Sequence, residues 1–139
     1  MITLTQYFMG RDITHEHALG SDLRENARRT VAAANSLLLF AKGAGVVLKP
    51  GSDWGMVRSG WRPAAINAAT PGASRTSLHM RCMAIDLEDA DHTLAAWCYA
   101  NQSVVLRDLG LWLEHPDHTP TWCHVQTKPP GSGNRVFRP

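Results

Sequence analysis

The stretch "SLHMRCMAID", residues 77–86, places His79 seven positions before Asp86, with small and apolar residues between them. Its end continues into "MAIDLED", which predicts a buried strand that carries Asp86. The spacing is too long for one helical turn, so the two side chains can meet only if His79 lies in a loop that turns back onto the strand. The stretch therefore predicts a polar site built on a core strand.

Hydrophobic periodicity predicts one long helix before this stretch and a shorter one after it. Apolar residues in 21–45 recur at three- and four-residue steps and form a single stripe. Residues 91–101 have a second helical pattern, and "MVRSGWRP" at 56–63 predicts a short strand that its proline ends. We expect these helices to cover a sheet to which the short strand belongs.

Two later segments, "LGLWLE" at 109–114 and "TWCHVQ" at 121–126, predict strands that the proline-bounded loop "HPDHTP" joins into a hairpin. The tail, 128–139, has no periodicity and predicts a surface strap. Together these elements predict an α+β fold in a single domain, residues 1–139, with a small antiparallel sheet and one or two covering helices.

Composition and charge exclude several classes of protein. Hydrophobic residues make up 44% and charged residues 19% of the chain, as in an ordinary globular protein. The formal net charge is +2 and the 14 basic residues are scattered, which excludes a dedicated nucleic-acid binder but suits contact with an anionic polymer such as a bacterial wall. The longest apolar stretch, "VAAANSLLLFA", is too short to span a bilayer, so we expect no membrane insertion.

The cysteines and the first residues indicate the cellular setting. Three cysteines without a CxxC pair indicate synthesis in a reducing compartment. The opening "MITLTQYFMGRD" lacks the basic and apolar segments of a secretory signal. We therefore expect synthesis in the cytoplasm without a signal peptide.

The histidines and the aspartate of the predicted strand have the chemistry of a zinc site. A catalytic zinc takes three protein ligands, usually histidine and carboxylate, and keeps a fourth position for water. His79, Asp86 and His124 form such a set if the strands bring them together. His115 and His118 in the hairpin loop are rival ligands. Spacing alone leaves a metal site and a set of ordinary polar residues both open.

Three blocks in order, "SGWRP", "SLHMRCMAIDL" and "WCHVQ", resemble the zinc D-alanyl-D-alanine carboxypeptidase family, to which L-alanyl-D-glutamate endopeptidases and many phage endolysins are similar. The family pattern reads SGYR, then SxHxxGxAxD, then a late histidine after an aromatic residue. The family's fold is similar to that of lysostaphin-type enzymes and of the hedgehog signalling domain. The late block and the tail look most like phage members of the group.

The resemblance implies that His79, Asp86 and His124 bind zinc, which is the cofactor we expect. It also implies that Arg62 helps to stabilise the oxyanion of the reaction and that Ser77 lies in the substrate cleft. The substrates it implies are the stem peptides of peptidoglycan, cut by a carboxypeptidase or an endopeptidase reaction.

The catalytic base is absent from the family's usual position, because Thr121 and Trp122 stand before the late histidine. Side chains alternate between the faces of a strand, so one register of the hairpin places Glu114 and His124 on the same side. Trp112 and Trp122 would then wall the site and raise the pKa of Glu114 towards working pH. We therefore expect Glu114 to be the base and Trp122 to contact the substrate.

Two points stay open in the sequence. Asp117 and His118 in the loop are alternatives to Glu114 as the base. Cys82 replaces the family's glycine, so either the backbone there does without a positive φ or the loop is altered. A Cys82 thiolate close to the metal could also compete as a ligand.

The sequence therefore predicts a zinc metallopeptidase that hydrolyses peptidoglycan in phage-mediated degradation of the cell wall. It would act at the bacterial wall after release, or as a component of the virion. The alternative is a non-catalytic, zinc-containing phage protein with a structural or wall-binding role. The sequence leaves open which peptide bond is cleaved, the host and the oligomeric state.

Overall fold

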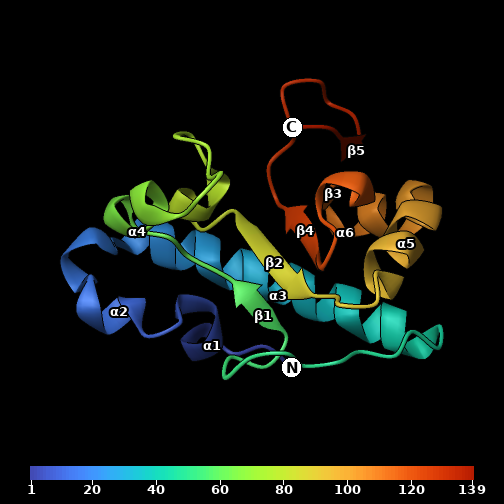
Figure 1. Ribbon diagram of the computed structural model, residues 1–139, viewed down its shortest axis with the longest axis horizontal. Coiled ribbons are helices and arrows are strands. Elements are labelled where there is room, and N and C mark those ends of the chain that lie inside the picture. Colours follow the sequence, from blue (N-terminus) through green and yellow to red (C-terminus); the bar gives the residue numbers. More distant parts are fainter.

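The computed structural model describes residues 1–139 and contains a five-stranded sheet with helices packed around it (Figure 1). The strands are β1 (Val57–Ser59), β2 (Ala84–Glu88), β3 (Trp112–Glu114), β4 (Trp122–Gln126) and β5 (Val136–Phe137). Their order across the sheet is β1-β2-β4-β3-β5. All neighbouring pairs are antiparallel except β3 and β5. The predicted α+β class is confirmed, and β5, which lies in the predicted strap, makes the sheet mixed.

The helices vary widely in length. They are α1 (Leu4–Phe8), α2 (Arg11–Thr14), α3 (Ser21–Gly43), α4 (Ala64–Ala69), α5 (Thr93–Ala100) and α6 (Arg107–Leu109). Short helical turns are η1 (Glu16–Ala18), η2 (Leu78–Arg81), η3 (Gln102–Leu106) and η4 (Pro116–His118). None of these helices combines the length and the apolar character needed to cross a membrane.

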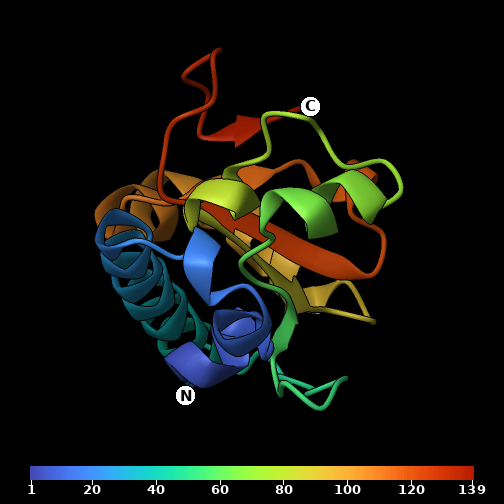
Figure 2. The ribbon, with the colours of Figure 1, turned by 90° about the vertical axis from the view of Figure 1, so that its left-hand side faces the viewer.

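The long helix α3 lies along the sheet and supplies much of the core (Figures 1 and 2). The apolar stripe seen in the sequence is its buried face, because residues three and four apart lie on one side of a helix. Its buried apolar members are Ala27, Val31, Ala34, Leu37, Leu38 and Ala41. They belong to one cluster with the inward-facing residues of β2, β3 and β4.

Alternation along β2 and β4 separates the core from the site. Ile85 and Leu87 are fully buried in the core, so Asp86 between them points to the other face of the sheet. Val125 is likewise buried, and the neighbouring His124 points to the same outer face as Asp86. The same strands therefore build the core with one set of residues and the site with the next.

The first twenty residues form two short helices that the hydrophobic periodicity of the sequence does not indicate. Thr3 and Gln6 form a capping box that starts α1. Tyr7 is fully buried, and its hydroxyl donates a hydrogen bond of 2.9 Å to the carbonyl of Ala84 in β2. The Tyr7 carbonyl accepts a bond of 3.2 Å from the Trp61 amide, just beyond β1. Figure 2 shows α1 beside β1.

Candidate metal centre

The turn η2 brings His79 to β2. The Ser77 hydroxyl caps this turn by accepting a bond of 3.3 Å from the His79 amide. The His79 side chain is buried, and its Nδ1 donates to the Gly60 carbonyl at 2.8 Å. A carbonyl can only accept, so Nδ1 carries the proton and Nε2 is left with its lone pair. This Nε2 has no hydrogen-bond partner and lies 3.4 Å from Asp86 Oδ1.

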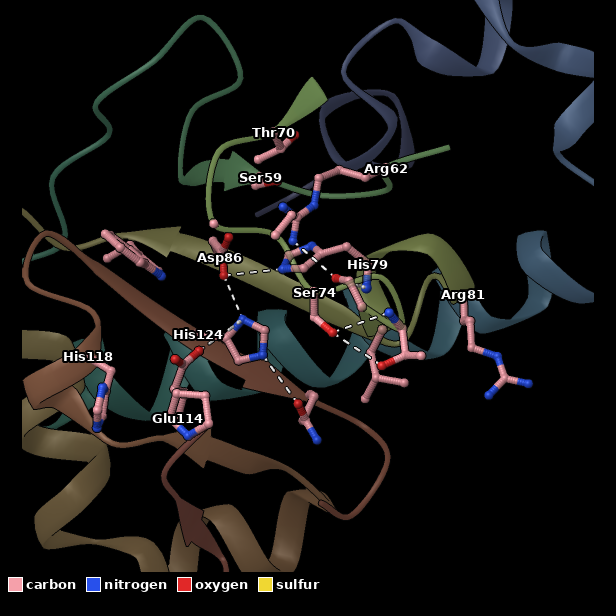
Figure 3. A pocket seen from close by; sticks show the side chains of 18 of the residues that line it. Ser59, Arg62, Thr70, Ser74, His79, Arg81, Asp86, Glu114, His118 and His124 are labelled. Atoms are coloured by element: carbon pink, nitrogen blue, oxygen red, sulfur yellow. Dashed lines mark hydrogen bonds and ion pairs between the residues drawn. The ribbon is translucent and has the colours of Figure 1, made fainter. Parts of the chain in front are cut away.

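Asp86 and His124 are direct neighbours across two strands. They are paired residues in the antiparallel register of β2 and β4. His124 Nδ1 lies 2.7 Å from Asp86 Oδ1, and its Nε2 lies 3.3 Å from Gln126 Oε1. With His79, these residues each offer one ligand atom, and the three atoms lie within 4.8 Å of one another. Figure 3 shows the three side chains converging.

This group fits a zinc ion. Two imidazoles and one carboxylate are the donor set of a catalytic zinc site that keeps an open position. A buried imidazole nitrogen without a partner, as in His79, is costly unless a further group satisfies it. The Gly60 carbonyl and the Gln126 side chain contact the outer nitrogens of His79 and His124, as partners that orient metal ligands do. The rival histidines His115 and His118 are not part of the group.

Burial and mutual contacts shift the pKa values of all three side chains. Burial lowers the pKa of His79 and so keeps its imidazole neutral, as metal binding requires. Burial alone would raise the pKa of Asp86, but the two imidazoles hold it well below its usual range. Burial also lowers the pKa of His124, but the hydrogen bond to Asp86 and the charges of Asp86 and Glu114 together outweigh it, so the net shift of the pKa is upward. The Asp86 carboxylate is therefore charged over the whole working range of pH.

Cys82 keeps the backbone conformation of a glycine. Its φ is +55° and its ψ is +29°, which excludes the alternative that this position does without a positive φ. A residue other than glycine in this left-handed region is held there by its surroundings at a modest cost. The Cys82 thiol is buried and lies outside the His–Asp–His group, and burial raises its pKa to about 12. With this pKa, a Cys82 thiolate that could compete as a ligand does not form at neutral pH.

Arg62 extends from the segment after β1 towards the same group (Figure 3). Its Nη2 donates to the Ser77 hydroxyl at 3.2 Å, and its backbone amide donates to the His79 carbonyl at 3.1 Å. Ser77 lines the cleft and also positions Arg62 and the turn that carries His79. The buried Arg62 Nε has no hydrogen-bond partner.

Glu114 lies on the same face of the hairpin as His124. Leu113 pairs with Val125 in the register of β3 and β4, so the next residue, Glu114, lies opposite His124. One Glu114 carboxylate oxygen is 4.0 Å from His124 Nδ1, and the side chain is 19% exposed. Burial raises its pKa, as a base that works near neutral pH needs, although the charge of His124 opposes the shift.

The two loop residues that are alternatives to Glu114 as the base, Asp117 and His118, differ in their position relative to the cleft. Asp117 is 68% exposed, pairs with Arg138 and does not line the cleft. His118 lines the cleft and lies 3.3 Å from an Arg138 nitrogen. The geometry therefore favours Glu114 over Asp117, while His118 remains within the cleft.

A broad, cationic cleft surrounds the group. Its volume is about 1140 Å³, and Trp122 forms part of its wall. Two acidic side chains line it, Asp86 and Glu114. Its basic residues are more numerous and are Arg11, Arg58, Arg62, Arg81 and Lys128. The cleft is thus suited to a ligand with negative charge.

Sequence reasoning missed three contributors to the site. Gln126 could have been found, because it lies two residues after His124 and so shares its strand face. The carbonyl of Gly60 carries no signal in a side-chain pattern. Arg11 lies in α2, far from the motif blocks in the chain, and no local pattern connects it with Arg62.

An α+β fold with a His–Asp–His group in an open cleft defines a class of small metallopeptidase-like proteins. A family model described as Peptidase M15 matches residues 23–125. The match spans most of the sequence, and the chain belongs to the peptidase M15 family, which is generally zinc-dependent. The chain matches no curated protein and no solved structure. The resemblance of the motif blocks to this family is thereby confirmed, and the likeness to phage members stays a prediction.

Proposed function

We propose that this protein is a zinc-dependent hydrolase of peptide bonds in the stem peptides of peptidoglycan. The observation that carries the proposal is the convergence of His79, Asp86 and His124 in a cationic cleft of a peptidase M15 chain. Stem peptides bear several carboxylates, which match the charge of the cleft. Contact with a bacterial wall during phage infection is the setting that the sequence resemblance suggests.

Each residue of the site has a distinct role in the proposed reaction. Zinc held by His79, Asp86 and His124 would polarise the scissile carbonyl and lower the pKa of water. Glu114 takes the proton of the attacking water, for which its raised pKa and its position beside His124 are suited. Arg62 donates hydrogen bonds to the oxyanion that develops on the carbonyl oxygen. Ser77 keeps the guanidinium in place.

Metal content and wall hydrolysis test the proposal together. Elemental analysis of protein purified without added metal should find near-stoichiometric zinc, and His79→Ala and His124→Ala should lose it. A zymogram on purified peptidoglycan should show clearing that a chelator abolishes and that added zinc restores. His115→Ala serves as the matched control and should keep both zinc and clearing, because His115 lies outside the group. A zinc-loaded wild-type protein that clears no peptidoglycan would contradict the proposal and favour a non-catalytic role.

A further inference from the structure

Arg11 reaches the cleft from a segment that precedes the matched family region. It begins α2, and its Nη1 donates a hydrogen bond of 2.6 Å to the carbonyl of Trp61. That carbonyl belongs to the peptide unit that leads into Arg62, so the two arginines approach the cleft side by side. Both line the cleft that contains the metal-binding group.

These two arginines differ from the other basic residues of the cleft. Arg58, Arg81 and Lys128 are exposed to solvent, whereas Arg11 and Arg62 are half-buried. No carboxylate lies within 4.0 Å of either half-buried guanidinium. Asp86 favours the charge of Arg62 from a greater distance, whereas no carboxylate acts on Arg11 in this way. A partly desolvated charge without a counter-charge is unfavourable, and a neighbouring like charge makes it more so.

The surroundings of Arg11 disfavour its positive charge. Burial lowers the pKa of Arg11, and the neighbouring charge of Arg62 lowers it further. The guanidinium nevertheless stays protonated and has five N–H donors, of which Trp61 occupies one. Arg11 therefore lies beside Arg62 with free N–H donors and without an anionic partner.

The proposed reaction supplies two neighbouring groups of negative charge. One is the oxyanion on the scissile carbonyl, to which Arg62 donates hydrogen bonds in the proposed reaction. The other is an α-carboxylate on the residue that contributes the scissile nitrogen, which is three covalent bonds from the scissile carbon. In stem peptides, both a C-terminal D-alanine and a γ-linked glutamate have a free α-carboxylate at this place.

We propose that Arg11 is a specificity-determining residue that binds this α-carboxylate beside Arg62. The inference rests on the proposed function, because it takes a peptide as the ligand. A guanidinium fork matches a carboxylate in geometry as well as in charge. Arg11 thus selects substrates whose residue after the scissile bond has a free α-carboxylate, and it discriminates against the corresponding amides.

Binding without turnover tests this role. The ligands are dipeptides in which a methylene group replaces the scissile carbonyl. Each is prepared in two forms, with the α-carboxylate free or amidated. Calorimetry on zinc-loaded protein measures the affinity for each form. The wild type should bind the acid at least about tenfold more tightly than the amide, as for a hydrogen bond between charged groups. Arg11→Ala should reduce this ratio to near one. Arg107→Ala, at an exposed arginine outside the cleft, should keep it.

A purely structural role of Arg11 gives a different result. Loss of the bond to the Trp61 carbonyl would weaken the acid and the amide equally, and an unchanged ratio in Arg11→Ala would overturn the inference. Arg11→Lys provides a second reading if Arg11→Ala does not fold, since lysine keeps a charge and can reach the carbonyl. The ratio of acid to amide affinity in Arg11→Lys should lie between one and the wild-type value. A ratio equal to that of the wild type would also overturn the inference.

Two ligand series distinguish the two sources of the carboxylate. One ends in D-alanine, and the other has glutamate linked through its γ-carboxyl group with the α-carboxylate free or amidated. A preference for the acid in either series supports the inference and identifies the source, whereas no preference in both overturns it. A wild type that shows the preference but hydrolyses no wall peptide would refute the proposed function alone.

Discussion

Gly60 is the residue at which the N-terminal segment meets the metal-binding group. A Cβ atom at this position would lie 1.8 Å from the Tyr7 carbonyl oxygen, closer than any real contact. The carbonyl of Gly60 accepts the hydrogen bond that orients His79. The absence of a side chain at one residue therefore allows both the packing of α1 and the orientation of a metal ligand.

Gly60→Ala should damage stability and metal binding together. We expect a loss of about 1–3 kcal/mol in the free energy of unfolding, because backbone atoms must move to admit the methyl group. Zinc affinity should fall by about 10–100-fold, as for the loss of other partners that orient metal ligands. Thermal unfolding and zinc titration measure the two effects. Gly43→Ala is the control, since the added methyl group would meet no atom within 4 Å beyond its own helix backbone and chain neighbours. Unchanged behaviour of Gly60→Ala would contradict the close approach.

Glu114→Gln isolates the role of the carboxylate. Glutamine keeps the shape of the side chain and removes its basicity, so zinc content should stay at the wild-type level while peptide hydrolysis falls by orders of magnitude. Asp117→Asn, in the exposed loop, should keep wild-type turnover. The measurement is the rate of hydrolysis of a defined stem peptide by each variant, with zinc content determined in parallel. Full activity of Glu114→Gln would point to His118, which also lines the cleft.

At the scale of elements, α5 depends on one buried carboxylate that precedes it. Asp89 is 6% exposed and accepts hydrogen bonds from the amides of Leu94 and Ala95, at 2.9 and 2.8 Å. These amides lie in the first turn of α5, where no partner within the helix is available. Because α5 packs on β3 and β4, its position also affects the strands that carry Glu114 and His124.

Asp89→Ala should therefore destabilise the protein far more than the same change two residues later. We expect a loss of about 1–3 kcal/mol for Asp89→Ala, because two buried amides lose their acceptor. Asp91→Ala removes only an exposed ion pair with Lys49 and should cost less than about 1 kcal/mol. Denaturant unfolding of the two variants gives both numbers. Equal losses would show that the Asp89 cap contributes little.

The elements that could be predicted are those with long or regular patterns. The stripe in 21–45 and the hairpin strands were found because their periods, 3.6 and 2, are local properties of the chain. The short helices α1 and α2 have too few residues to establish a period. The strand β5 forms because the tail meets the free edge of β3, and this meeting is not encoded in the tail's own sequence.

At the scale of the whole molecule, the two ends of the chain contribute differently. The N-terminal segment is part of the core, where Ile2, Tyr7 and Phe8 are at most 5% exposed. The C-terminal segment lies over the cleft, with Phe137 stacked edge-on to His124 at a centroid distance of 6.3 Å. Figure 1 shows the tail rising above β3 and β4, away from α1.

Truncation at the two ends should separate these contributions. Removal of residues 1–9 exposes the partners of three large buried side chains, each worth about 1.5–3 kcal/mol, and this sum approaches the whole stability of an ordinary domain. We expect this variant to lose its cooperative thermal transition. Removal of residues 135–139 takes away β5 and its flanking residues, none of which is fully buried, so folding should persist while zinc affinity and hydrolysis decline. Circular dichroism on heating tests the first outcome, and a cooperative transition without residues 1–9 would contradict it.

The sequence by itself determined the family, the fold class and the faces of the central strands. The order of the motifs indicated the family, and the alternation of residues around Asp86 and His124 indicated the faces of the strands. Both are patterns within short segments of the chain. Tertiary structure alone decided that Arg11 lies beside Arg62 and that Gly60 must lack a side chain. These features are contacts between segments far apart in the chain, and a one-dimensional pattern contains no information on which distant residues meet.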